Sequence, residues 1–223
     1  MTNGFDFQHT TLSEKIKNYL LDCIINKKIY QPGYKIVETQ IAKELNVSQA
    51  PVREAIKDLK IMGFIESEPY KGSYIKEISV KELKDVYSVR SVLEELAVKQ
   101  AFNNISQEFV DQLQSIVNQM TEAARTENYI VQADLDWEFH YKMVSLSQNT
   151  ALEKIYTDLG IKYWIIRGVT FLAGHKMFDY EFQALRHQPI LDTIIHSDLP
   201  AAVTLIRNHY EENISLVERT ENQ

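Results

Sequence analysis

Four residues in the second half of the sequence have the types and the spacing of a metal site. Asp136 and His140 are four positions apart, so on a helix they share one face and can hold one ion together. His187 and His209 lie on two later predicted helices that could converge on the same point. One carboxylate and three imidazoles suit one divalent transition metal per chain (Zn, Ni, Mn or Fe), and octahedral coordination leaves positions for water or a chelating anion. The alternative is a buried cluster of hydrogen-bonded histidines.

An arginine on an earlier predicted helix is a candidate partner for an anionic ligand. Arg90 can pair bidentately with a carboxylate. Glu94 lies one helical turn further on and could hold the same guanidinium instead, so both interpretations stay open. Arg167 and Arg186 are weaker candidates for the same role. Three histidines fall outside the metal-site pattern: His9, His175 and His196.

The composition predicts a mainly helical chain. Its 223 residues include only 7 Gly and 5 Pro, whereas an all-β fold needs frequent turns built largely from those two types. Neither type occurs from Ser73 through Leu159, which suits long helices. The single cysteine, Cys23, excludes an internal disulfide and favours a reducing compartment. With no signal-peptide pattern and no apolar run near the ~20 residues of a membrane span, we expect a cytoplasmic protein without a membrane partner.

The net charge of −7 hides an asymmetry along the chain. Residues 1–79 carry 11 Lys and Arg against 10 Asp and Glu, whereas residues 80–223 carry 13 against 21. The first part also has most of the glycine and proline, which indicates short elements with tight turns followed by long elements. We therefore expect two domains, residues 8–78 and 79–223, with different electrostatic roles.

The first part has the element order of a winged helix-turn-helix. An amphipathic helix is predicted over residues 12–26 and a short helix over residues 37–45. Ser48 is a natural N-cap for a third helix, which Gly63 terminates. Residues 64–75 are predicted to form two short strands around a turn. This order is that of a DNA-binding fold whose third helix is the recognition helix.

The residues themselves resemble the GntR family of bacterial transcription regulators. The resemblance covers about residues 12–75, and the run Val47-Ser-Gln-Ala-Pro-Val-Arg-Glu-Ala55 is its most specific part. It implies that the helix after Ser48 enters the major groove and that the hairpin tip reaches the DNA backbone or the minor groove. The other residues that carry the resemblance are Pro32, Gly33, Glu38, Ile41, Ala42, Leu45, Leu59, Gly63 and Gly72.

The resemblance also implies which side chains contact DNA. Ser48 and Arg53 would contact phosphate or base edges, and Gln49 carries an amide that can read adenine. The wing and its neighbour would contribute the phosphate-binding Lys35 and Lys71, together with Gly72, which lets the backbone approach the DNA closely. Many relatives carry Arg and Thr where this chain has Gln49 and Ala50, so their operator sequence cannot be transferred to this chain.

Two further expectations concern the DNA-binding part. Arg53 could instead form a surface ion pair with the adjacent Glu54. Because phosphate contacts supply most non-specific affinity, so weakly basic a domain should bind DNA poorly alone. We therefore expect a homodimer on a two-fold symmetric double-stranded operator. The acidic part should supply most of the dimer contact, because a small winged domain has little apolar surface to spare.

The second part is predicted to be an antiparallel bundle of six helices. The capping-box patterns Ser79-x-x-Glu82 and Thr150-x-x-Glu153 open two of them, and helices over residues 107–125 and 130–147 lie between. A fifth passes through His187 to His196 and is either started late or kinked by Pro189, and a sixth ends near Glu218. The first of the six is predicted to bury seven apolar side chains: Leu83, Val86, Tyr87, Val89, Leu93, Leu96 and Ala97.

This part resembles the FadR-type effector domain of the same family, in its shorter six-helix, VanR-like form. The resemblance covers nearly all of residues 80–218 and is carried by Arg90, Glu94, Asp136-x-x-Phe139-His140, Asn149, His187, Asp198, Ala202 and His209. It implies a metal at the Asp136 cluster and effector contacts from Arg90 and Asn149. The sequence therefore predicts a ligand-responsive transcription regulator with a small carboxylate effector.

Two other functions compete with this prediction. A metalloenzyme fused to a DNA-binding domain is one, since three histidines and an aspartate with open positions can activate water. However, no motif places a general base beside the ligands, although Glu138 and Asp134 are near in sequence. The other is a sensor of the metal itself, which would bind metal reversibly and need no organic effector.

Overall fold

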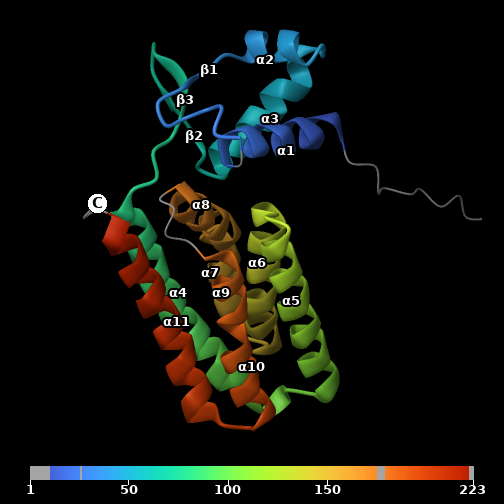
Figure 1. Cartoon of the computed structure of the whole chain (residues 1–223), viewed down its shortest axis with the longest axis vertical. Coiled ribbons are helices and arrows are strands. Elements are labelled where there is room, and N and C mark those ends of the chain that lie inside the picture. Colours follow the sequence, from blue (N-terminus) through green and yellow to red (C-terminus); the bar gives the residue numbers. More distant parts are fainter. Residues whose placement is uncertain (1–10, 26, 175–178, 221–223) are drawn as a thin grey trace, which may run out of the picture. The chain divides into compact units, whose positions relative to one another are not determined.

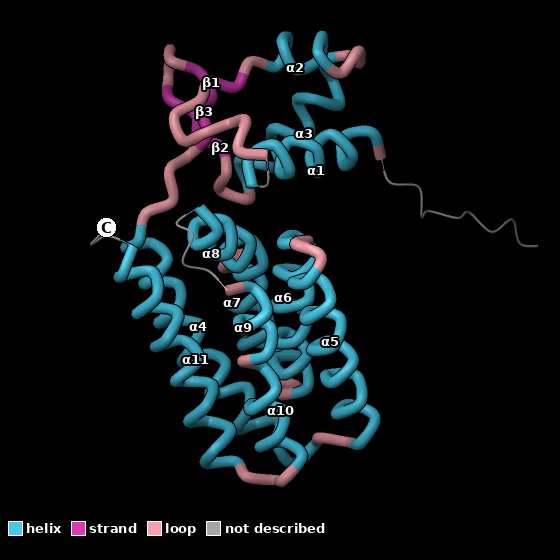
Figure 2. Tube along the Cα trace, viewed as in Figure 1, coloured by secondary structure: helices cyan, strands magenta, loops and turns pink. Residues whose placement is uncertain are grey.

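The computed structural model describes residues 11–25, 27–174 and 179–220. The chain divides into two compact units, residues 1–77 and 78–223, and among the described residues strands are seen only in the first (Figures 1 and 2). The structure confirms the predicted fold class, a winged helix-turn-helix followed by a helical bundle. Within the described residues, no helix combines the length and the apolar character that crossing a membrane requires.

In the first unit, the described residues form three helices and a small sheet. Its elements are α1 (Leu12–Ile25), β1 (Lys35–Ile36), α2 (Glu38–Glu44), α3 (Gln49–Ile61), β2 (Ile65–Glu68) and β3 (Gly72–Ile75). The sequence does not predict β1, which pairs antiparallel with β3 and gives the strand order β1-β3-β2. Two residues are too few to show a period-two pattern, and only the pairing with β3 makes them a strand.

The recognition helix α3 is held by one face only. Val52, Ala55 and Leu59 are fully buried, while Gln49 and Arg53 on the other face are exposed. Burying a Val or Leu side chain stabilises the fold by about 1.5–3 kcal/mol, so α3 is fixed without using its outer face. The outer face of α3 is therefore available to a ligand.

The described residues of the second unit form helices and the turns between them. Its elements are α4 (Val80–Ala101), a 3-10 turn (Phe102–Asn104), α5 (Gln107–Arg125), α6 (Tyr129–Leu146), α7 (Thr150–Asp158), α8 (Ile161–Gly174), α9 (Tyr180–Leu185), α10 (His187–Ile195) and α11 (Leu199–Thr220). The helices α4 and α11 lie side by side along their length, as do α5 and α6 (Figure 1).

Two of the six predicted helices are each divided in two. Gly160 has a left-handed φ of 62° and separates α7 from α8. Pro189 lies in the first turn of α10, where its missing N–H leaves no bond back to Leu185. The predicted helix is therefore interrupted at Arg186, next to His187, and does not simply begin later in the sequence.

The N-cap residue is the predicted one for α4, but for α7 it lies one residue before the predicted position. The Ser79 side chain accepts a hydrogen bond from the backbone N–H of Glu82, as the capping box predicts. The predicted box at Thr150 is wrong, because Asn149 caps α7 by accepting from the backbone N–H of Leu152. Asn is as good a cap as Ser or Thr, so the sequence pattern alone could not choose between neighbours.

The inward face of α4 differs from the predicted one. Leu83, Tyr87 and Ala97 are buried, but Val89 and Leu96 are exposed. Arg90 and Glu94 occupy the inner face instead. A sequence pattern that assigns every apolar residue to the core cannot predict that polar residues are buried there while apolar residues are exposed. An apolar stripe is consequently left on the outer face of α4.

Candidate metal centre and effector cavity

The structure brings the four predicted metal ligands together. Asp136 and His140 project from α6, His187 is the first residue of α10, and His209 lies in α11. One candidate ligand atom from each residue can be chosen so that all lie within 4.8 Å of one another. The three histidines are buried and the aspartate is half-buried. Three separate helices therefore meet at one point, which a bound ion would hold together.

The outer hydrogen bonds of two histidines orient their rings. His140 Nδ1 lies 2.5 Å from Glu94 Oε2, and His187 Nδ1 lies 3.1 Å from the Ala184 carbonyl. Both partners are acceptors, so each Nδ1 carries a proton and each Nε2 points toward the cluster. The two Nε2 atoms are 3.1 Å apart, and His187 Nε2 also lies 3.3 Å from Asp136 Oδ2. These separations suit ligands of one ion, because neighbouring ligands about 2.1 Å from an ion are about 3 Å apart.

Asp136 and His209 also have the protonation states that metal ligands require. Burial tends to raise the pKa of Asp136, but the His187 hydrogen bond and the charges of His140 and Arg90 outweigh it and hold that pKa well below its usual range. Burial, reinforced by nearby positive groups, keeps the pKa of His209 well below its usual range. His209 Nδ1 is buried and has no hydrogen-bond partner among the described residues. A carboxylate and a neutral imidazole are the ligand forms of these side chains.

A buried carboxylate supports the site from behind. Glu94 accepts from the Tyr156 hydroxyl at 2.6 Å and from Arg90 Nε at 3.3 Å, besides contacting His140. Burial opposes its ionisation, yet His140 and Arg90 lower the pKa of Glu94 to about 2. A carboxylate on the outer nitrogen of a metal-binding histidine orients the ring and raises its basicity. The helical spacing predicts Glu94 as a partner of Arg90, and the structure shows that Glu94 contacts both Arg90 and His140.

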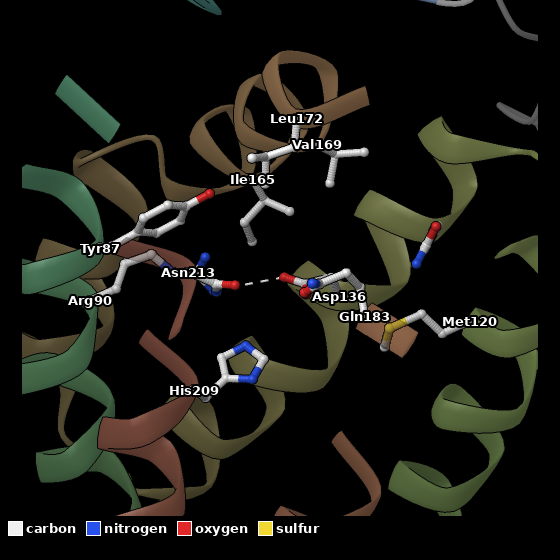
Figure 3. A pocket seen from close by; sticks show the side chains of 11 residues that line it. Tyr87, Arg90, Met120, Asp136, Ile165, Val169, Leu172, Gln183, His209 and Asn213 are labelled. Carbon is white, nitrogen blue, oxygen red and sulfur yellow. Dashed lines mark ion pairs between the residues drawn. The ribbon is translucent and has the colours of Figure 1, made fainter. Parts of the chain in front are cut away.

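A cavity adjoins the cluster. It has a volume of about 40 Å³ and is lined by Tyr87, Arg90, Met120, Gln132, Asp136, Ile165, Val169, Leu172, Gln183, His209 and Asn213. Figure 3 shows the three α8 side chains on one side and Arg90, Asp136 and His209 on the other. Ile165, Val169 and Leu172 thus form an apolar wall opposite a polar one.

Arg90 is the cation of this cavity. Its side chain is almost wholly buried, and Nη2 lies 3.8 Å from Asp136 Oδ1, the ion pair drawn as a dashed line in Figure 3. Nη2 makes no hydrogen bond to the described residues. An unpaired buried guanidinium nitrogen is costly, and an anionic ligand in the cavity would satisfy it.

Several residues of the sequence predictions lie elsewhere. Asn149 caps α7, and its Nδ2 donates to Gln100, so the structure does not bring it to the cavity. Arg167 does not line the cavity, and its guanidinium lies over the Trp164 ring. His196 is exposed and its Nδ1 contacts the Asp192 carbonyl. His9 and His175 lie outside the described residues.

Some cavity residues were not predicted from the sequence. Gln132 lies four positions before Asp136, so the same helical spacing that pairs Asp136 with His140 could have found it. Gln183 and Asn213 come from α9 and α11 and share no sequence pattern with the cluster. Only the tertiary structure identifies them.

The predicted DNA contacts lie on exposed parts of the first unit. Ser48 and Gln49 are exposed at the start of α3, and Lys71 and Gly72 are exposed at the hairpin turn. Gly72 has φ 105°, a left-handed value that favours glycine. Lys71 forms an ion pair with Glu68, and the Cβ that a side chain would add at Gly72 would lie 3.3 Å from Cε of the exposed Lys35.

The partner of Arg53 is not the predicted alternative. Arg53 Nε donates to Glu38 Oε2 at 2.9 Å, and no contact with Glu54 is found among the described residues. The side chain is 67 % exposed. One bond at Nε leaves the terminal guanidinium nitrogens available for a DNA phosphate or base edge.

Comparison with known proteins gives the family of the chain. Residues 12–75 match the bacterial regulatory proteins of the gntR family, and residues 85–212 match the FCD domain. The chain belongs to the GntR family. This GntR regulator is therefore a DNA-binding transcription regulator with an FCD domain, and its relatives are regulators rather than enzymes. Regulators of this family bind DNA and, through the FCD domain, a small-molecule effector.

Individual relatives support this assignment. The Nta operon transcriptional regulator of Aminobacter aminovorans is 32% identical over 71% of this chain and 71% of its own length. A Paenarthrobacter nicotinovorans protein, named as a probable D-xylose utilization operon transcriptional repressor, is 27% identical over 90% of this chain and 86% of its own. The solved structure of E. coli McbR/YncC has a TM-score of 0.68 at 18% identity and covers 96% of this chain and 100% of its own, which shows the shared fold.

Proposed function

We propose that this GntR regulator binds one divalent transition metal at Asp136, His140, His187 and His209, and senses a small carboxylate beside it. The observation that carries the proposal is the approach of the His140 and His187 Nε2 atoms to 3.1 Å, next to a buried His209 Nδ1 that has no hydrogen-bond partner among the described residues. A metal with open positions supplies a Lewis-acidic anchor for an anion. Arg90, which lines the same cavity, supplies a second positive group.

The DNA contacts are proposed from the outer face of the first unit. Arg53, Ser48 and Gln49 would contact one stretch of major groove, while the wing would place Lys71 and Gly72 against the backbone. Lys35 adds a phosphate contact beside the wing. The operator is then recognised by two such units, one from each protomer, which requires a two-fold symmetric site.

We place the homodimer contact on the second unit. Val89, Val92 and Leu96 form a stripe on the outer face of α4, and each is between 39 and 68% exposed. Ile155 of α7 and Leu159, the residue that follows this helix, are also exposed. Contiguous exposed apolar residues mark interaction sites, and a second copy is the occupant that this face fits.

Charge and packing support that choice. The helices α4 and α7 are joined by hydrogen bonds from Tyr156 to Glu94 and from Asn149 to Gln100, so their apolar residues belong to neighbouring helices. The exposed Asp85 and Lys99 lie beyond opposite ends of the α4 stripe. An antiparallel pair of α4 helices brings these unlike charges together across a two-fold axis near Val92, whereas a parallel pair would place like charges opposite each other.

Effector and operator are coupled by a population shift. The dimer can adopt conformations that differ in the spacing of its two DNA-binding units. An effector that binds one of these conformations more tightly changes operator affinity by the ratio of its own affinities for the two conformations. Because the metal joins α6, α10 and α11, an anion bound to it and to Arg90 of α4 contacts the helix that carries the dimer face. The cytoplasm, where DNA and small metabolites meet, is the proposed compartment.

The metal content of purified protein tests the proposal. His140→Ala and His209→Ala should each lose the metal that the wild-type protein retains after dialysis, as measured by elemental analysis. The matched control is His196→Ala, which removes an exposed histidine outside the cluster and should retain the metal. One equivalent of metal persisting in both cluster variants would show that these residues form only a polar core.

A further inference from the structure

A groove on the surface of the bundle ends at the same residue as the buried cavity. The groove lies between the end of α9, α10 and α11 and has a volume of about 310 Å³. His209 lines both the groove and the cavity. On the groove side Phe182 and Leu185 are 56 and 47% exposed, whereas on the cavity side Arg90 and Met120 are almost wholly buried. The residues around His209 therefore form a wall between the cavity and the surface.

Arg186 is the central side chain of that wall. It lines the groove rather than the cavity, and its side chain is only 8% exposed. Its Nη1 donates to Gln183 Oε1 at 2.6 Å and to Asn213 Oδ1 at 2.7 Å, and both amides line the cavity (Figure 3). Its Nη2 donates to the His209 carbonyl at 2.7 Å and pairs with Glu212 of the groove at 2.8 Å. One guanidinium thus reaches from the cavity lining to the groove lining.

The wall is held by side-chain bonds rather than by helix packing. The helix α9 packs against α5, whereas α11 packs against α4 and α10. Arg186 lies at the interruption between α9 and α10, and its bonds to Asn213 and Glu212 join that point to α11. Rotation about the side-chain torsions of Arg186 breaks these bonds without displacing a helix.

The other sides of the cavity offer no comparable opening among the described residues. Tyr87, Met120 and Leu172 line the cavity from α4, α5 and α8, and all three belong to the hydrophobic core. An opening between them would separate closely packed helices, which costs far more than turning one side chain. The wall at Arg186 is therefore the place where the cavity opens most readily.

We propose that small solutes, the metal ion included, reach the buried site along the groove between α9, α10 and α11, and that Arg186, held closed by Glu212, is the gate of this passage. The inference rests on the proposed function, because it concerns access to that same site. With the guanidinium turned outward, the groove continues into the cavity beside His209. With the guanidinium in place, the bound ion is shut off from water and its exchange is slow.

A gate changes rates and leaves affinity unchanged, which gives the test its readout. A fluorescent zinc indicator follows uptake by metal-free, full-length protein, and transfer of bound zinc to an excess of chromophoric chelator gives the release rate. Glu212→Gln keeps the side-chain size but removes the charge that holds Arg186. Both rates should rise by the same factor, up to about fivefold as expected for an exposed ion pair, with the dissociation constant of zinc unchanged.

The matched control is Glu211→Gln. Glu211 is exposed, lies one position away on α11 and does not line the groove. Its substitution removes the same charge, so any weaker attraction of the zinc cation affects both variants. The difference between the rates of the two variants therefore measures the gate.

A second variant should act in the opposite direction. Asn208 is exposed and lines the groove, so Asn208→Trp fills the passage with a large side chain. Uptake and release should both slow, again with the zinc dissociation constant unchanged. Asn118→Trp is its control, because Asn118 is an exposed asparagine on α5 that does not line the groove.

The outcomes separate the gate from the site behind it. Parallel changes of the two rates at constant affinity, faster in Glu212→Gln and slower in Asn208→Trp, support the inference. Rates that match those of the control variants, in protein that binds one equivalent of zinc, overturn it and leave the proposed function standing. A changed affinity with an unchanged uptake rate also overturns it, because the residues would then act on the bound state. Wild-type protein that binds no zinc overturns the proposed function and the inference together.

Discussion

The two units place their chemistry in opposite environments. The DNA-binding candidates Ser48, Gln49 and Arg53 are exposed on the outer face of a helix whose inner face makes the core. In the bundle, His140 and His187 are buried and belong to the core itself. Recognition and stability are therefore separable in the first unit and coupled in the second.

The difference follows from what each ligand offers. DNA is a large surface that comes to the protein, so exposed side chains on a rigid helix are enough. A small anion has few atoms and gains affinity only where water is excluded and charges are concentrated. Buried charges in turn require partners, which Glu94, Arg90 and Tyr156 supply to one another and to His140.

The largest expected effect tests the coupling of metal to stability in the bundle. With free zinc at about a thousand times its dissociation constant, binding to the folded state alone stabilises the protein by about 4 kcal/mol. Removing the metal with a chelator should therefore lower the melting temperature of the wild-type protein, as measured by calorimetry. His140→Ala should melt at the same temperature with and without zinc, because it has lost the binding that couples to folding.

The control for this experiment is His196→Ala, an exposed histidine that makes only a local contact with the Asp192 carbonyl. It should retain the full zinc-dependent shift. A metal-loaded wild-type protein whose melting does not respond to the chelator would contradict the coupling.

The next effect concerns the dimer. Val92→Glu puts two like charges near the proposed two-fold axis, and like charges across an interface cost several kcal/mol, so the dimer should weaken about a hundredfold or more. Analytical ultracentrifugation measures this directly. Val131→Glu is the matched control, since Val131 is a similarly exposed valine on α6 outside the stripe. Dimerisation that survives Val92→Glu unchanged would place the interface elsewhere.

The smallest effect is expected in the first unit. Arg53→Ala should weaken binding to a selected operator by about tenfold, as loss of one phosphate or base contact does, and should leave the melting temperature unchanged. Fluorescence anisotropy at fixed salt measures the affinity. Lys60→Ala, at the far end of α3, removes an exposed charge and is the control. If Arg53→Ala lowered the melting temperature as much as His140→Ala does, recognition and stability would be coupled in the first unit as well.

Much of the fold follows from local patterns. The order of helices and hairpin in the first unit, the capping of α4 by Ser79 and the mainly helical character of residues 80–174 and 180–220 are predicted correctly, because each depends on residues close together in the chain. The elements that were missed depend on distant partners. The strand β1 exists only through its pairing with β3, and the outward position of Val89 depends on Arg90 and Glu94 taking the inner face.

The candidate site divides in the same way. The sequence alone determined that Asp136 and His140 share a helix face and that His187 and His209 carry the same chemistry, because residue type and spacing are local properties. Only the tertiary structure decided that three helices bring these side chains together, that Glu94 contacts the His140 ring, and that Arg186 of one helix end bonds to Asn213 of α11. These contacts join residues on separate helices, such as Arg186 and Asn213, which are 27 positions apart. No periodicity along the chain encodes which faces of separate helices will meet.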